Sequence, residues 1–259
     1  GKLNRQPERY RFIPTIDIDS AWAYRHKPLL RQIGGLARAA IRFGVRETSE
    51  RLKVLIRLSK DPFDTFAVIE DIHAGREKPL LFFLLGKYGE HNKNQSPQNR
   101  HYRDLIRRTG NYSHTGIHPS YETYLHTTLL KDEKETLAGI IDRPVERSRQ
   151  HFLRIKLPET YRTLLMAGIK EDYSMGFADQ PGFRAGTCHP FRFYDLAAEE
   201  ETDLRIFPLA LMDGTLRDYL NLNTEEATSI IYGLADTVRM YDGVFVLLWH
   251  NESLSNKRR

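Results

Sequence analysis

Short apolar segments alternate with longer amphipathic ones along the whole chain. Residues 80–85 and 244–249 are continuous apolar runs of strand length, and residues 10–19 are a third strand-like segment. Continuous runs are typical of parallel strands that are buried on both faces. Apolar residues at helical spacing predict helices between them, at residues 28–43, 48–59, 62–69, 99–108, 121–128, 132–142, 158–167 and 224–241.

Weaker strand signals complete the pattern. They lie at residues 112–114, 147–153, 169–173, 191–194 and 206–211, and a polar loop covers residues 87–97. Because strands and helices alternate without a linker or a repeat, we expect one α/β domain over residues 1–259, with a parallel sheet. Reactive polar residues follow several strands, which favours a barrel over an open sheet. Further domains outside this sequence remain compatible with the pattern.

The composition excludes several classes of protein. Of 259 residues, 40% are hydrophobic and 28% are charged, as in a globular enzyme. The net charge is +5, but basic and acidic residues are interleaved, so we expect a solvated surface and no nucleic-acid partner. No apolar run is long enough to span a membrane, and no signal peptide opens the sequence. A cytoplasmic location is the default expectation, with the cell envelope left open.

Cysteine chemistry contributes little. The single cysteine, Cys188, rules out an internal disulfide and a multi-cysteine metal site. No neighbouring pattern supplies an activating base, so we do not expect Cys188 to be a nucleophile.

The strongest local motif is His-Thr-Gly-Ile-His-Pro at residues 114–119. Two imidazoles four residues apart can bind one cation on a helix turn or at a strand-to-helix bend. Pro119 suits the first turn of a helix, so we place His114 at a strand end and His118 in the bend that follows. The alternative is that the two histidines are close by accident and only line the surface.

A second motif places two acids at the end of the first strand. Asp17 and Asp19 are two residues apart, so their side chains project from the same face of a strand. Two like charges there are costly unless a positive charge lies beside them, and a metal ion supplies one. The alternative is a solvated strand end that caps the next helix. The last strand delivers His250 at its carboxyl end, which by itself is weak evidence for function.

Together these motifs resemble the polysaccharide deacetylase family, also called the NodB-homology domain or carbohydrate esterase family 4. Its motifs are Thr-Phe-Asp-Asp-Gly, His-Ser/Thr-x-x-His-Pro and a late Leu-x-x-His. The chain matches the second motif completely and the last at residues 247–250. The first motif is altered at residues 15–19, because one residue separates the acids and no glycine follows. The resemblance extends from Thr15 to His250.

The resemblance implies a fold and a metal site. The fold would be a distorted (β/α)7 barrel, similar to a TIM barrel, with an open groove. The metal ligands would be Asp19, His114 and His118, which leaves coordination positions free for water and substrate. Zn²⁺ is the default divalent ion, although this ligand set suits others. Asp17 would be the general base and His250 the general acid.

The middle motifs match less closely. The family's Arg-x-Pro-Tyr/Phe is best matched at residues 149–152, where His151 replaces the proline, and Arg184 is the rival arginine. By resemblance, Arg149 would pair with the general base, and Asp172 would orient either the general acid or the arginine. A backbone N–H near Phe152 would help to hold the oxyanion. His151 is left open as an extra ligand, a substrate contact or a filler of the proline's space.

Two tryptophans are further candidates for substrate binding. Trp22 and Trp249 lie beside the two ends of the predicted site and could stack on a sugar, although large aromatic residues more often belong to the core.

The implied activity is metal-dependent removal of N-acetyl groups from an amino-sugar oligosaccharide or polysaccharide. An alternative keeps the metal site and hydrolyses a C–N bond outside sugars, in a cyclic imide or a ureide. A second alternative is a carbohydrate-binding domain without catalysis.

Overall fold

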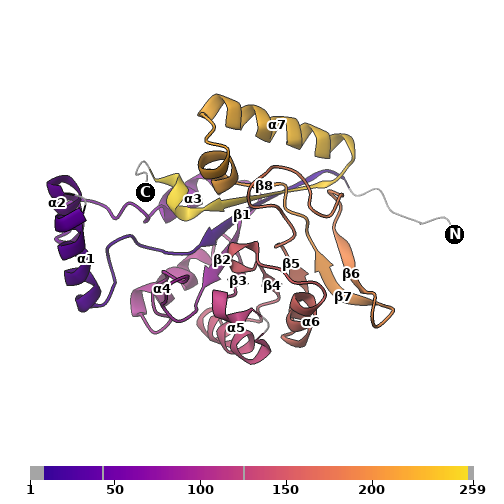
Figure 1. Cartoon of the computed structure of the whole chain (residues 1–259), viewed down its shortest axis with the longest axis horizontal. Coiled ribbons are helices and arrows are strands. Elements are labelled where there is room, and N and C mark those ends of the chain that lie inside the picture. The colour runs from indigo at the N-terminus through magenta and orange to yellow at the C-terminus, as the bar shows by residue number, and fades with distance from the viewer. Residues whose placement is uncertain (1–8, 43, 125, 256–259) are drawn as a thin grey trace.

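The computed structural model describes residues 9–42, 44–124 and 126–255. A nine-stranded sheet in the order β6-β7-β5-β4-β3-β2-β1-β9-β8 forms its centre. It curls into a half-barrel (Figure 1). β6 is antiparallel to β7, and the other seven strand pairs are parallel. The strands are β1 (Arg11–Ile18), β2 (Leu80–Leu84), β3 (His114–His118), β4 (Arg147–Ser148), β5 (Glu171–Asp172), β6 (Phe191–Asp195), β7 (Glu200–Ile206), β8 (Leu211–Met212) and β9 (Val244–His250).

Helices surround the sheet. In Figure 1, α4 (Arg100–Thr109), α5 (Thr127–Ile141) and α6 (Glu159–Met166) lie on one side and α7 (Thr224–Met240) on the other. α3 (Phe66–His73) precedes β2, and the single turns are η1 (Tyr121–Thr123), η2 (His151–Leu153), η3 (Thr215–Tyr219) and η4 (Asn251–Leu254).

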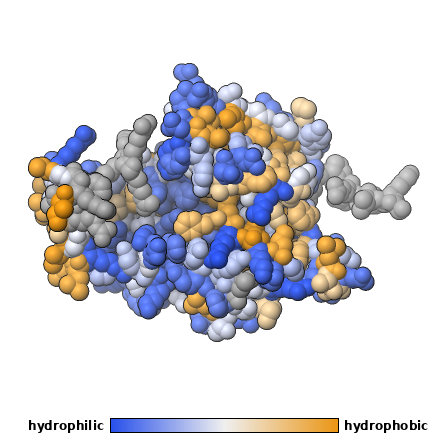
Figure 2. Space-filling model, viewed as in Figure 1, coloured by the Kyte–Doolittle hydropathy of each residue, from blue (hydrophilic) through white to orange (hydrophobic). Residues whose placement is uncertain are grey.

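A pair of helices, α1 (Leu29–Arg42) and α2 (Gly44–Leu55), stands apart from the barrel. Figure 2 shows apolar side chains on this pair, which include the exposed residues Leu29, Leu30 and Val45. Within the described residues, no helix is both long and apolar enough to cross a membrane.

The alternation of side chains along the strands divides the buried apolar residues into one inner core and two outer ones, of which the smaller contains Phe245 of β9 and Val238 of α7. Ile16 and Ile18 of β1 belong to the outer core between the sheet and helices α4, α5 and α6. Ile13 of the same strand belongs to the inner core, which fills the barrel. Thr15 and Asp17 share this inner parity, so the first strand delivers a carboxylate to the carboxyl end of the barrel.

The expected α/β class with a barrel-type sheet is confirmed. One strand boundary differs from the expectation in a way that matters below. We expected a strand to end at His114, but β3 begins there and ends at His118. Its sequence, His-Thr-Gly-Ile-His, contains one strongly apolar residue, Ile117. The hydrophobic pattern therefore gives almost no indication of where this strand begins and ends.

Candidate metal centre

Three potential ligands meet at the carboxyl end of the sheet. Asp19 follows β1, His118 ends β3, and His151 opens the turn η2 after β4. One ligand atom from each lies within 4.8 Å of the other two. Nε2 of His118 is 3.2 Å from Oδ1 of Asp19, and Nε2 of His151 is 3.6 Å from Oδ2. One carboxylate and two imidazoles are a common set for a divalent metal.

Hydrogen bonding directs a lone pair of His118 towards this cluster. Its Nδ1 lies 2.6 Å from the carbonyl oxygen of Arg149, which can only accept, so Nδ1 carries a proton. In the neutral ring, Nε2 then presents a lone pair to Oδ1 of Asp19, a buried oxygen without a hydrogen-bond partner in the described residues. Two such atoms at 3.2 Å repel unless a proton or a metal ion lies between them. The residues therefore fit a metal ion.

The pKa values of Asp19 and His118 are shifted in directions that agree with this arrangement. Burial opposes ionisation of both groups, but their mutual contact prevails. The close contacts with the imidazoles of His118 and His151 hold the pKa of Asp19 well below its usual range. Asp17 and Asp19 raise the pKa of His118 above its usual value. A cation is thus favoured at this point, whether a proton or a metal.

Asn92, which sequence reasoning did not identify, positions His151. Its Oδ1 lies 3.3 Å from Nδ1 of His151 and also accepts a hydrogen bond from the backbone N–H of Tyr121. Its amide nitrogen donates to Glu122 and to the carbonyl oxygen of Lys87. This fixes the amide orientation and leaves Nε2 of His151 facing Asp19.

The expected ligand His114 lies elsewhere, so this part of the predicted triad is corrected. His114 and His118 are the two ends of β3, about 13 Å apart at the rise of a strand. His114 is exposed overall. The partial burial of its imidazole and the charge of Arg147 lower its pKa. A spacing of four residues brings imidazoles together on a helix but separates them along a strand. In the cluster His151 occupies the third position.

The expected pair between Asp17 and Arg149 is present. Nη1 of Arg149 donates to Oδ1 of Asp17 at 3.0 Å and to the hydroxyl of Thr15 at 2.6 Å. Its Nε donates to the carbonyl oxygen of Tyr173, and its guanidinium lies 4.7 Å from the ring centre of Phe82. The side chain is fully buried. An arginine fixed in this way holds the carboxylate rigid beside the metal cluster.

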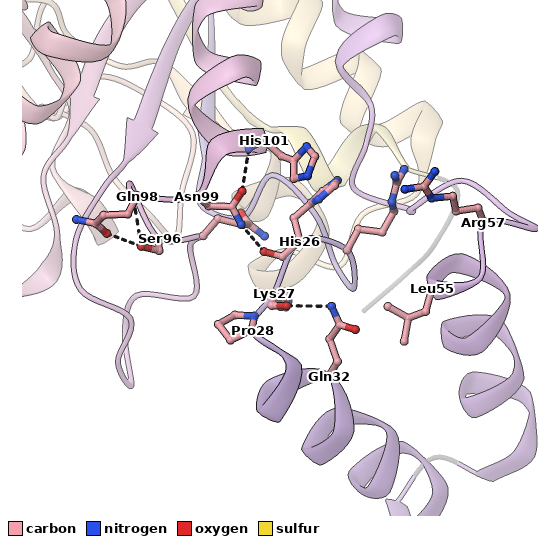
Figure 3. Close-up of a pocket in the computed structure, with 12 residues that line it drawn as sticks. His26, Lys27, Pro28, Gln32, Leu55, Arg57, Ser96, Gln98, Asn99 and His101 are labelled. Atoms are coloured by element: carbon pink, nitrogen blue, oxygen red, sulfur yellow. Dashed lines mark hydrogen bonds between the residues drawn. The ribbon is translucent and has the colours of Figure 1, made fainter.

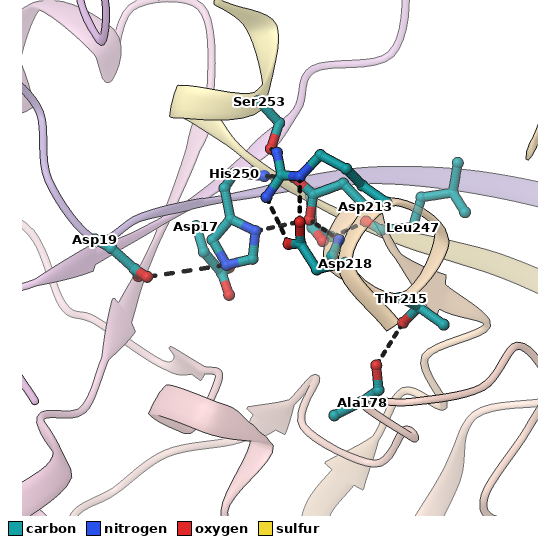
Figure 4. A network of polar contacts seen from close by, with 12 residues as sticks. Asp17, Asp19, Ala178, Asp213, Thr215, Asp218, Leu247, His250 and Ser253 are labelled. Carbon is teal, nitrogen blue, oxygen red and sulfur yellow. Dashed lines mark hydrogen bonds and ion pairs between the residues drawn. The ribbon is translucent and has the colours of Figure 1, made fainter. Parts of the chain in front are cut away.

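His250 borders the cluster from the opposite strand, β9 (Figure 4). Its Nε2 is 3.9 Å from Oδ2 of Asp19, and its Nδ1 is 2.7 Å from Oδ1 of Asp213. The backbone N–H of His250 also donates to Asp213. Although burial lowers it, the charge of Asp213 raises the pKa of His250 to about 10. The imidazole is therefore protonated at neutral pH.

Asp213 was not identified from the sequence, and Asp172 does not take its place. Asp172 is fully buried and accepts hydrogen bonds from Ser148 and Ser174. Burial raises its pKa, while the charge of Arg149 acts in the opposite direction. Of the two expected partners, Asp172 therefore lies on the arginine side of the site and not beside His250.

Among the described residues, no hydrogen bond or ion pair joins the rival arginine to this arrangement. Arg184 is exposed, and its charge acts on Tyr161 of α6, which belongs to the outer core.

The aromatic candidates separate into two groups. Trp22 is buried in the outer core, and Trp249 is partly buried against the same core, which agrees with the core alternative for both. Phe152 is 60% exposed and stacks on His151, with ring centroids 4.3 Å apart. Tyr121 packs edge-on against Phe152. The exposed aromatic surface beside the cluster is therefore Phe152 with Tyr121.

Comparisons with known proteins support the fold. No protein-family model and no curated protein sequence matches the chain. A solved structure described as a polysaccharide deacetylase from Mycobacterium smegmatis matches with TM-score 0.57 and 13% identity, over 95% of this chain and 78% of that chain. Another polysaccharide deacetylase, from Pseudomonas aeruginosa PAO1, matches with TM-score 0.54 and 12% identity, over 97% and 84%.

A structure described as an allantoinase is similar to the same degree. It matches with TM-score 0.54 and 10% identity, over 97% of this chain and 83% of that chain. At these identities the comparisons show a shared fold. The resemblance inferred from the motifs thus agrees with the structure at the level of the fold.

Proposed function

We propose that the chain is a metal-dependent hydrolase that removes N-acetyl groups from an amino-sugar substrate. The observation that supports this most strongly is the convergence of Asp19, His118 and His151, with the carboxylate of Asp17 on one side and the imidazole of His250 on the other. Similar folds in structures described as polysaccharide deacetylases agree with it.

The three ligands would hold a divalent ion, with Zn²⁺ as the first candidate. Such an ion polarises a carbonyl group and acidifies water. Three protein ligands leave positions for both.

Asp17 is the proposed general base. Its Oδ1 is held by Arg149, while Oδ2 lies 3.7 Å from Nε2 of His118, at the edge of the metal cluster. From there Oδ2 accepts the proton of the attacking water.

His250 is the proposed general acid. The nitrogen that leaves as an amine must gain a proton, and His250 is protonated at neutral pH. Asp213 binds its Nδ1 and so directs Nε2 towards the cluster. A peptide N–H near Phe152, where the backbone is left-handed (φ 59°, ψ 19°), is our proposed oxyanion donor. The exposed ring of Phe152 would support a sugar ring.

The test combines metal content with turnover. The Zn²⁺-loaded protein should release acetate from N-acetylglucosamine oligomers, and Asp17→Asn should retain the metal while losing at least about 100-fold in kcat. Failure to bind a divalent metal, or an Asp17→Asn variant with normal turnover, would overturn the assignment.

A second candidate is hydrolysis of a ureide or cyclic imide at the same centre, which the structural similarity to an allantoinase favours. Ring opening of allantoin and of small cyclic imides, assayed beside acetate release, separates the two substrate classes.

A further inference from the structure

A cavity of about 620 Å³ lies between the barrel and the α1–α2 pair (Figure 3). Three basic residues, Arg25, Lys27 and Arg57, line it, and no acidic residue does. The remaining lining residues include amide and imidazole groups, such as Gln32, Asn99 and His101. The cavity thus combines positive charge with many hydrogen-bond donors, as an anion site requires.

The wall that carries Arg25 is fixed by buried hydrogen bonds. The carboxylate of Asp61 accepts from the backbone N–H groups of Ala23, Tyr24 and Arg25. The side chain of Asn99 donates to the carbonyl oxygen of His26 at 2.7 Å. Because these bonds constrain the backbone, the basic side chains start from fixed positions.

Two of the cations are not neutralised by the protein. Among the ion pairs of the described residues, none involves Arg25 or Arg57. A smaller adjoining cavity of about 300 Å³ shares both arginines and has Asp64 and Asp104 in its lining. The larger cavity is therefore the place where an anion meets cations alone.

Two adjacent histidines respond to the electrostatic potential in this cavity. The rings of His26 and His101 have centroids 4.1 Å apart. Burial, followed by the charges of His101 and Arg25, lowers the pKa of His26 to about 4. Both effects oppose a further positive charge, and a bound anion would reverse the second of them.

Two chain segments connect the cavity to the metal centre. Asp19 and Arg25 belong to the segment after β1, six residues apart and so within about 21 Å. Asn92, which contacts His151, and Gln95, which lines the cavity, are three residues apart in the loop after β2. Gln95 also joins the two segments, because its side chain binds Ala21 and Trp22 of the first. The cavity and the metal centre are therefore joined by two short stretches of the chain.

We propose that this cavity binds a phosphoryl group that is carried by the acetylated substrate. The volume far exceeds that of a single phosphate and suits a sugar phosphate or diphosphate, whose two or more negative charges match the basic side chains. The substrate part of this inference rests on the proposed deacetylase function, whereas anion binding itself does not.

A titration without metal tests the anion site alone. EDTA-treated full-length protein is titrated with inorganic pyrophosphate by calorimetry, and NMR follows the imidazoles of His26 and His101. Pyrophosphate should bind and raise the pKa of His26. Arg25→Gln and Arg57→Gln should each weaken binding about tenfold or more, which corresponds to about 1.4 kcal/mol. Arg46→Gln removes the same charge from α2 outside the cavity and should bind as the wild type does.

Absence of pyrophosphate binding, or equal weakening in all three variants, would overturn the proposal. Circular dichroism and thermal unfolding check that each variant is folded. Because Arg25 and Arg57 lie on different segments, the second variant still tests the cavity if the first fails to fold.

A kinetic comparison tests whether the substrate carries the phosphoryl group. With the Zn²⁺-loaded protein, N-acetylglucosamine 1-phosphate should have a lower KM than N-acetylglucosamine, and Arg25→Gln should remove the difference. Equal KM values would show that the anion is not part of the substrate and would overturn that part. If neither sugar is hydrolysed, the proposed function fails, while the pyrophosphate titration still decides the cavity.

Discussion

His114 and His118 show how one spacing has opposite consequences in two backbones. On a helix, residues four apart lie on the same face about one turn apart, within reach of one cation. On β3 they share a face but lie at opposite ends of the strand. His151 instead enters from a turn after β4, and the lone pairs of His118 and His151 converge because Arg149 and Asn92 bind their other nitrogens.

Replacing either His114 or His151 with alanine tests which of the two is the third metal ligand. His151→Ala should weaken Zn²⁺ binding by at least about 100-fold, because loss of an outer contact alone typically costs 10- to 100-fold. His114→Ala should bind Zn²⁺ as tightly as the wild type. Competition against a fluorescent chelator measures both. The opposite order would restore His114 as the ligand.

Asp213 should set the alkaline limit of activity. Its charge raises the pKa of His250, so the general acid stays protonated up to high pH. In Asp213→Asn that pKa falls, and the alkaline limb of the kcat/KM profile should move to lower pH by about one unit or more, while the acidic limb stays in place.

Asp218 provides a control for this profile. It is paired with Arg217 on η3 near the same histidine but does not touch it, so Asp218→Asn should shift the limb much less. An unchanged alkaline limb in Asp213→Asn would remove His250 from the role of general acid.

At the scale of elements, the predictable parts were those with a periodic hydrophobic signal. The helices corresponding to α4 and α7, and the strands β2 and β9, agree closely with the predicted ranges. The motifs also indicated Asp17, Asp19 and His250 correctly as neighbours of one centre. The strand β3 was misplaced because glycine and histidine carry no such signal. Asn92 comes from a loop and Asp213 from the helical turn directly after β8, and in such short connections periodicity says nothing about contacts.

Gly116, in the middle of β3, shows why this strand lacks that signal. A Cβ there would lie 2.5 Å from ring atoms of Phe82 and 3.1 Å from the carbonyl oxygen of Arg147. Phe82 is fully buried under the guanidinium of Arg149. Gly116→Ala should therefore lower the free energy of unfolding by about 1 to 3 kcal/mol and reduce kcat, because Arg149 is displaced.

The matched control is a glycine with space around it. Nothing lies within 4 Å of a Cβ at Gly139 in α5, so Gly139→Ala should stabilise the protein by about 0.5 to 1 kcal/mol. Denaturant unfolding measures both changes. A neutral Gly116→Ala would contradict the close packing of β3 against β2.

Glu133 links α5 to the end of β3. Its carboxylate accepts hydrogen bonds from the backbone N–H and hydroxyl of Ser120, yet burial raises its pKa to about 7. In the unfolded chain this carboxyl has its ordinary pKa of 4.5, so the stability from this group is fully present below that pH and is lost as pH rises through about 7.

Replacing Glu133 with glutamine should remove this loss. Between pH 5 and pH 8, the unfolding free energy of Glu133→Gln should rise relative to the wild type by about 2 to 3 kcal/mol, measured with EDTA present. Glu135→Gln, at an exposed position of the same helix, should show no such trend. A flat difference for Glu133→Gln would mean that this carboxyl is ionised in the folded protein throughout the range.

At the scale of the whole molecule, the metal centre joins parts of the chain that are far apart in sequence. Asp19 follows β1, His118 ends β3 and His151 follows β4, so β2 separates the first of these strands from the other two. His250 comes from β9 on the other side of β1. The curvature of the sheet and buried polar contacts bring these segments together at the carboxyl end of the sheet. An ion bound to all three ligands would add a direct cross-link between the first and the middle strands.

Binding of the ion should therefore stabilise the entire domain and not only the site. At a free Zn²⁺ concentration of about 100 times Kd, the expected gain is about 2.7 kcal/mol, which raises Tm by roughly 5 to 10 °C for a chain of this size. EDTA should reverse the shift, and His151→Ala should abolish it, whereas His114→Ala should retain it. Scanning calorimetry at several Zn²⁺ concentrations measures the effect. A shift of equal size in the His151→Ala variant would show that the stabilising ion binds elsewhere, because this variant lacks one of the three groups that the sheet brings together.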